Sequence, residues 1–159
     1  MTNLHLSPQQ AAVELLRRRK ARSDLRAFAS AIDVPGKPVS EDQDEWIFNP
    51  IESSVADHHN LLLSALQETM ETPFGRLMVF MPPGSAKSTY GSVVAPVWYM
   101  GKFPGKKIIL ASYGSDLARR HGRRARFIAR QSGYKGIFRS SISSDTSAAA
   151  KIISALDTR

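Results

Sequence analysis

Two short apolar runs constrain the fold of this chain more than any other feature of its sequence. They are Leu77–Met81 and Lys107–Ala111, and turn-forming residues precede each of them. A continuous apolar run of this length is typical of a strand that is buried on both faces of a parallel sheet. Between the runs, Ser88–Met100 is predicted to form a helix that Gly101 ends. This order predicts an α/β fold, in which a right-handed crossover joins two parallel strands.

The sequence before these runs predicts a helical N-terminal region. Ser7 is a typical N-cap residue and Pro8 a typical first helical residue, so a helix begins there, and its pattern allows it to continue to Ala31. Asp57 can cap a second helix, which ends before Pro73. The chain then divides into a helical region with an irregular linker, an α/β core, and a low-complexity tail or truncated end, at residues 1–56, 57–139 and 140–159.

Composition narrows the class of protein. With 42% apolar and 23% charged residues, the 159-residue chain is predicted to be globular, and the absence of cysteine excludes disulfide frameworks and thiolate zinc sites. No apolar run approaches the roughly 20 residues that are needed to cross a bilayer. We therefore expect a cytoplasmic protein that has no membrane partner.

Charge is distributed unevenly along the chain. Residues 1–71 carry 7 basic and 11 acidic side chains, whereas residues 72–159 carry 15 basic and 3 acidic ones. Eleven of the 22 basic residues lie between Lys102 and Arg139, where Asp116 is the only acidic residue. This asymmetry predicts a polyanion-binding surface in the second half of the chain, and a solvated basic face is the alternative.

The segment after the first apolar run contains the residue types that bind phosphate groups. Such a site needs backbone N–H groups, a helix N-terminus, a lysine ammonium and a hydroxyl for Mg²⁺. Compared with the pattern G-x-x-x-x-G-K-[ST], Met81 and Ala86 replace the two glycines, and the Cβ of Ala86 is tolerable if its φ stays negative. An ordinary strand-to-helix turn is the alternative. The candidate phosphate-binding residues are Gly84, Ser85, Ala86, Lys87, Ser88 and Thr89.

From about Ala56 to Phe138, the sequence resembles the ATPase domain of phage terminase large subunits, which are motors that drive double-stranded DNA into capsids. The order and spacing of several short pieces carry the resemblance. These pieces are His58-His59 with Leu61-Leu62, Arg76–Thr89, Pro96-x-Trp98-Tyr99-x-Gly101-x-x-Pro104, Ala111-Ser112-Tyr113, Leu117-Ala118 and Gly122-Arg123-Arg124.

The resemblance implies a P-loop NTPase fold, in which helices flank a parallel sheet, and a cofactor pair of ATP and Mg²⁺. It also implies that Lys87 contacts the β- and γ-phosphates and that Ser88 binds Mg²⁺. The partners that it implies are double-stranded DNA, the small terminase subunit, the portal protein and other large subunits.

The helix predicted after the second apolar run is a candidate DNA-binding element. Its arginines recur at intervals of four, three and four residues and so share one stripe, while an apolar stripe can pack against the core. Solubility or a subunit contact is the alternative. The DNA-facing candidates are Arg119, Arg123, Arg126 and Arg130, and the packing candidates are Leu117, His121, Ala125 and Ile128.

The acidic motif that hydrolysis requires, an apolar strand ending in an Asp/Glu pair, does not follow Lys87 in this sequence. Asp157, after the partly apolar run Lys151–Leu156, is only a weak mimic, and a helix fits that run equally well. A nuclease metal cluster is also missing. We therefore expect the N-terminal part of a terminase large subunit, shortened by gene decay or a frameshift, with little or no turnover alone. The alternative is a non-catalytic DNA-binding remnant of a degraded prophage gene.

Two pairs of ring-bearing residues complete the candidates. His58 and His59 are neighbours on a predicted helix and should point in different directions, so packing is predicted rather than metal binding. Trp46 and Phe48 are candidates for stacking on an adenine ring, and packing against the core is the favoured alternative.

Overall fold

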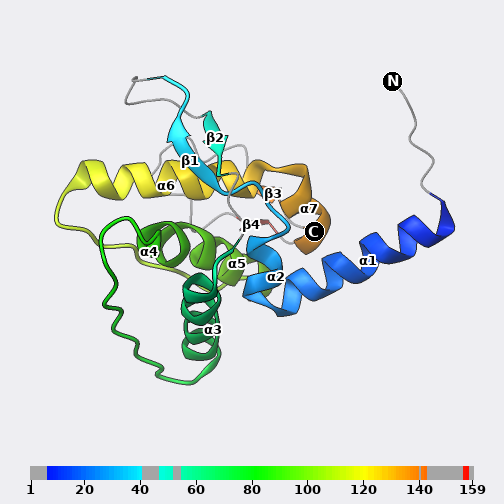
Figure 1. Cartoon of the computed structure of the whole chain (residues 1–159), viewed down its shortest axis with the longest axis horizontal. Helices are drawn as coiled ribbons and strands as arrows, with labels where there is room; N and C mark the ends of the chain where they lie inside the picture. The colour runs from blue at the N-terminus through cyan, green and yellow to red at the C-terminus, as the bar shows by residue number, and fades with distance from the viewer. Residues whose placement is uncertain (1–6, 41–46, 52–54, 140, 143–155, 158–159) are drawn as a thin grey trace.

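The computed structural model describes residues 7–40, 47–51, 55–139, 141–142 and 156–157. Helices predominate within these ranges (Figure 1). The N-terminal half contains α1 (Pro8–Ser23), α2 (Leu25–Ala29), β1 (Pro35–Pro38), β2 (Phe48–Pro50) and α3 (Asp57–Glu71). The second half contains α4 (Lys87–Thr89), the π-helical η1 (Tyr90–Val94), α5 (Ala95–Lys102), α6 (Ser115–Arg130), α7 (Ser132–Phe138), β3 (Ser141–Ile142) and β4 (Leu156–Asp157).

The predicted α/β fold, a P-loop NTPase with a parallel sheet between helices, is wrong. The described strands form two separate antiparallel pairs, β1 with β2 and β3 with β4. Neither Leu77–Met81 nor Lys107–Ala111 forms a strand, and Figure 1 shows the chain between α3 and α4 as a long loop beside the helices. An apolar run becomes a buried strand only where other strands pair with its backbone, and the described ranges supply none. Phe80 and Ile109 are consequently 84% and 92% exposed.

The predicted N-terminal helix is confirmed, but it ends earlier than its pattern allows. Gln10 donates its backbone N–H to the Ser7 side chain at 3.2 Å, and Ser7 donates its own to the Gln10 side chain at 2.9 Å, which makes a capping box. The helix stops before Asp24, whose carboxylate accepts hydrogen bonds from the Arg26 and Ala27 backbones and caps α2 instead.

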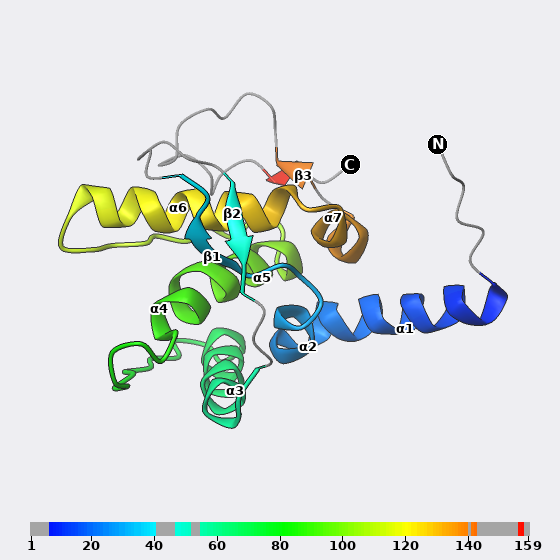
Figure 2. The same cartoon turned by 45° about the horizontal axis from the view of Figure 1, so that its top comes forward.

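Trp98 lies in the hydrophobic core, to which α1, α2, α3, η1, α5, α6 and α7 all contribute. Its ring is fully buried, and its indole N–H donates to the Ala21 carbonyl of α1 at 3.1 Å. Tyr134 of α7 donates its hydroxyl to the Val97 carbonyl at 3.2 Å, and its ring packs against Phe28 of α2. The first turns of α1 project away from this core (Figure 2).

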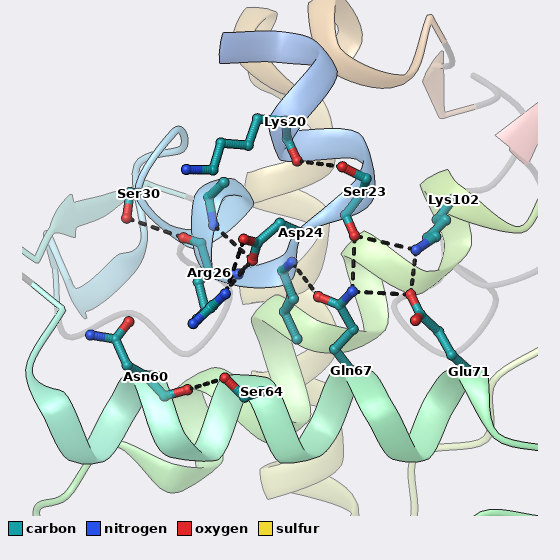
Figure 3. A network of polar contacts seen from close by, with 12 residues as sticks. Lys20, Ser23, Asp24, Arg26, Ser30, Asn60, Ser64, Gln67, Glu71 and Lys102 are labelled. Atoms are coloured by element: carbon teal, nitrogen blue, oxygen red, sulfur yellow. Dashed lines mark hydrogen bonds and ion pairs between the residues drawn. The ribbon is translucent and has the colours of Figure 1, made fainter. Parts of the chain in front are cut away.

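A polar cluster joins α3 to the end of α5 and to the turn between α1 and α2 (Figure 3). Gln67 accepts a hydrogen bond from the Leu25 backbone at 2.8 Å and donates one to the Ser23 carbonyl at 2.9 Å. Lys102 forms an ion pair with Glu71 and lies 4.5 Å from the centre of the Trp98 ring. These contacts join α3, which precedes the candidate phosphate-binding loop in the chain, to α5, which follows it.

Candidate phosphate-binding loop

The loop of residues 82–86 leads into a helical run that continues from α4 through η1 to the end of α5. Two residues of this loop have left-handed backbone conformations, Gly84 with φ +81° and Ala86 with φ +54°. Ser85 closes the turn, because its hydroxyl donates to the Pro82 carbonyl at 2.7 Å. Open space surrounds Gly84, where an added Cβ would meet no atom within 4 Å. The loop is therefore accessible to a ligand.

The backbone of Ala86 is strained, and the condition under which its Cβ would be tolerated, a negative φ, is not met. A left-handed conformation costs an L-residue with a Cβ about 1–2 kcal/mol. Phe74 and Arg139 are the other non-glycine residues with positive φ in the described ranges; Arg139 caps the end of α7, where this conformation is common, and Phe74 lies in the turn three residues after α3. Ala86 instead precedes a helix. Strain of this kind is concentrated at functional sites and points to a role for the loop.

Ala86→Gly is expected to raise the free energy of unfolding by about 0.5–1 kcal/mol, because glycine adopts this backbone without the Cβ clash. Chemical denaturation measures the change. Ala118→Gly, at the fourth position of α6, is the matched control and should lower the free energy by about the same amount. A destabilising effect of Ala86→Gly would show that the left-handed backbone is wrongly assigned.

Hydrogen-bond donors gather where the loop enters the helix. The first turn of any helix has N–H groups without intrahelical acceptors, and Ala86 supplies no side-chain cap for them. Lys87 and Thr89 are half-buried at this point, and Ser88 is exposed. The predicted residues thus provide, along one continuous segment, backbone N–H groups, the Lys87 ammonium and the serine and threonine hydroxyls. Such a set suits a phosphate group.

A metal ion at this loop would depend on Ser88 and on the phosphates themselves. Within the described ranges, no group of three or more His, Cys, Asp or Glu side chains could hold a metal. Mg²⁺ tolerates a site of this kind, because it usually keeps several waters and takes few ligands from the protein when it binds with phosphates.

The sequence analysis did not identify His59 and Tyr90 as residues of this site. The rings of His58 and His59 lie 3.9 Å apart, so the expectation that these neighbours point in different directions is wrong. His59 also packs against Tyr90 of η1, with 4.8 Å between ring centres. Burial and the neighbouring His58 lower the pKa of His59, while a hydrogen bond with the Ser85 backbone acts in the opposite direction. This contact between α3 and the loop has no signal in the sequence spacing.

The four predicted DNA-facing arginines do not form one exposed stripe. Arg119 and Arg130 are exposed and Arg123 is half-buried, but Arg126 is only 2% exposed. The prediction fails at Arg126 because α6 packs against α7 and β1 as well as η1 and α5, which widens its buried face. Burial, followed by the charge of Arg130, lowers the pKa of Arg126. The predicted packing face is confirmed at the residues His121, Ala125 and Ile128, which are buried.

Acidification below pH 6.5 is expected to lower the free energy of unfolding, because His121 is buried in α6 among positive charges. Burial and then Arg124 and Arg120 lower its pKa from the ordinary 6.5. The unfolded chain therefore takes up the proton first, and the slope reaches at most about 1.4 kcal/mol per pH unit for one histidine. Urea unfolding between pH 8 and pH 5 measures it. His121→Gln should reduce the slope without removing it, because the pKa of His59 is lowered too; an unchanged slope would contradict the assignment.

The remaining sequence candidates are Phe48, Trp46 and Asp157. Phe48 is buried, and its ring packs edge-on against Phe127 at 5.6 Å, in agreement with the predicted core packing. Trp46 lies outside the described residues. Asp157 belongs to β4, where it pairs with Ser141 in an antiparallel ladder, and most of the run before it is outside the described residues.

Comparisons with protein-family models, with curated proteins and with solved structures found no match for this chain. In the part of the chain that the structure describes, no helix is both long enough and apolar enough to span a membrane. The resemblance to terminase large subunits thus stays a prediction, and the local geometry of the loop is compatible with a phosphate group at a helix start.

Proposed function

We propose that this chain binds ATP together with Mg²⁺ through Gly84–Thr89, as the N-terminal part of a phage terminase large subunit. One observation carries the proposal. The left-handed backbone at Gly84 and Ala86 lies directly before a helix that begins with Lys87 and Ser88. In an ordinary turn, the strain at Ala86 would bring no benefit. In a phosphate-binding loop, a left-handed residue turns successive backbone N–H groups toward the anion.

Each residue of the loop has a distinct part in this proposal. The backbone N–H groups at the start of the helix donate to phosphate oxygens, and the positive end of the helix dipole adds to their effect. Lys87 places its ammonium against the β- and γ-phosphates, and Ser88 provides a hydroxyl ligand for Mg²⁺. The proposal is limited to nucleotide binding and does not include hydrolysis. The acidic residues after Lys87 are Asp116, Asp145 and Asp157, and they do not form the Asp/Glu pair that would activate a water molecule.

Titration calorimetry with MgATP tests the proposed function. We expect saturable binding of MgATP. Inorganic triphosphate should compete with MgATP, and adenosine should compete far less, because the loop contacts the phosphates. MgATP at about 100 times its dissociation constant should also stabilise the fold by about 2.7 kcal/mol. If MgATP gives neither binding heat nor a rise in melting temperature, the proposed function is wrong.

DNA binding without nucleotide is the second candidate, and the exposed arginines of α6 favour it. Arg119, Arg120 and Arg130 are exposed on this helix, although Arg119 lies within 3.9 Å of Asp116. Phosphate contacts by arginines would give binding that is independent of sequence and that weakens steeply with salt. Salt-sensitive DNA binding by a chain that does not bind MgATP would favour this candidate. In the terminase role, the same arginines would contact double-stranded DNA, and the small subunit, the portal protein and other large subunits would be further partners.

A further inference from the structure

His59 links the start of α3 to the candidate phosphate-binding loop. Its side chain is half-buried, and its Nδ1 accepts a hydrogen bond from the Ala56 backbone N–H at 3.3 Å. Because Nδ1 is an acceptor there, the proton of the neutral ring is on Nε2. Nε2 can therefore donate to a carbonyl, and the backbone of Ser85 lies close enough to this ring to raise the pKa of His59.

The same ring contacts the helix on the other side of Lys87. His59 packs against Tyr90 with 4.8 Å between ring centres and 46° between ring planes. Tyr90 is buried and donates its backbone N–H to the carbonyl of Ala86 at 3.0 Å. The His59 ring thus lies beside the Ser85 backbone, before Lys87, and against Tyr90, after Lys87. Tyr90 in turn is hydrogen-bonded to the strained Ala86.

A strained backbone conformation persists only when contacts with the surrounding structure outweigh the strain energy. Within the loop, the hydrogen bonds of Ser85 to Pro82 are local and form one turn. The contact with His59 is different, because it ties the loop to α3, a helix that the Gln67 and Lys102 contacts fix to the core.

We propose that His59 is a positioning residue of the phosphate-binding loop, which it holds against α3 so that the N–H groups around Lys87 face a phosphate. The inference rests on the proposed function. His59 has no contact with the nucleotide in this proposal, and it acts through the backbone of the loop and through Tyr90.

Three variants test this role with MgATP binding as the measurement. His59→Phe keeps a ring against Tyr90 but removes both nitrogens, and we expect at least a tenfold loss of affinity. His59→Gln keeps one acceptor and one donor and should lose less than threefold. Leu61→Phe introduces a ring at an exposed position of the same helix and is the matched control, with an expected affinity equal to that of the wild type. Wild-type affinity in His59→Phe, or an equal loss in His59→Gln, would overturn the proposal.

A second measurement separates this inference from the proposed function. Hydrogen exchange of the Gly84–Lys87 amides in the ligand-free protein reports the order of the loop without any nucleotide. We expect faster exchange in His59→Phe than in the wild type and in Leu61→Phe, with α6 amides unchanged. Equal exchange rates in all three proteins would overturn the positioning role. If the wild type does not bind MgATP but exchange differs as expected, the proposed function fails while His59 still orders the loop.

Discussion

Trp98→Ala is expected to lower the free energy of unfolding by about 3–5 kcal/mol. The indole is fully buried where α1 meets α5, and its N–H bonds the Ala21 carbonyl at 3.1 Å. Truncation leaves a cavity and an unpaired carbonyl, and it removes the ring that the Lys102 ammonium faces at 4.5 Å. Because natural domains have only about 5–15 kcal/mol of stability, this single change should leave the chain close to unfolding.

Chemical denaturation of three proteins measures this effect. Trp98→Phe fills most of the volume but cannot donate to Ala21, so its loss should be smaller than that of Trp98→Ala. Val13→Ala in the projecting part of α1 is the control for an exposed apolar side chain, and we expect a change within about 0.5 kcal/mol. A loss below 1 kcal/mol in Trp98→Ala would contradict the position of this ring in the core.

Lys87→Ala is expected to raise the dissociation constant for MgATP at least 100-fold, which corresponds to about 2.7 kcal/mol. The variant removes the one ammonium at the start of the helix and leaves the polyphosphate without a charged partner there. The stability of the ligand-free protein should change little, because the side chain is only half-buried. Calorimetry with MgATP and denaturation without it separate the two effects.

Lys106→Ala is the matched control for this experiment, because it removes the same charge from an exposed residue in a different loop. Its affinity for MgATP should stay within about threefold of the wild type, which is the effect of long-range charge alone. Equal affinities in Lys87→Ala and Lys106→Ala would remove Lys87 from the proposed role.

The starts of the helices could be predicted from the sequence to within one residue, because local residues determine them. Ser7 and Gln10 form the capping box that starts α1, as expected, whereas Asp57 is the first residue of α3 and not its cap, because Ala56 takes the N-cap position. The two apolar runs could not be predicted in the same way. Hydrophobic periodicity reports which side chains favour burial, but a strand also needs backbone partners that are distant in the sequence. Met78 is 78% exposed because such partners are lacking among the described residues.

The candidate site could be predicted only in part. Lys87 and Ser88 are recognisable from the residue types that bind phosphate, and the structure places them at a helix start. The left-handed Ala86 and its contact chain through Tyr90 to His59 depend on how α3 packs, which no spacing in the sequence encodes. Arg126 illustrates the same limit, because it is only 2% exposed at a position on the helix that predicts exposure.

The central claim is that the loop at the start of α4 binds the phosphates of a nucleotide. Backbone amide shifts measured by nuclear magnetic resonance during titration with MgATP test it most directly, because they report each N–H group separately. We expect the largest shift changes at Gly84–Thr89, and the same changes with Mg²⁺ and inorganic triphosphate. Shift changes confined to α6, or none at saturating MgATP, would contradict the claim.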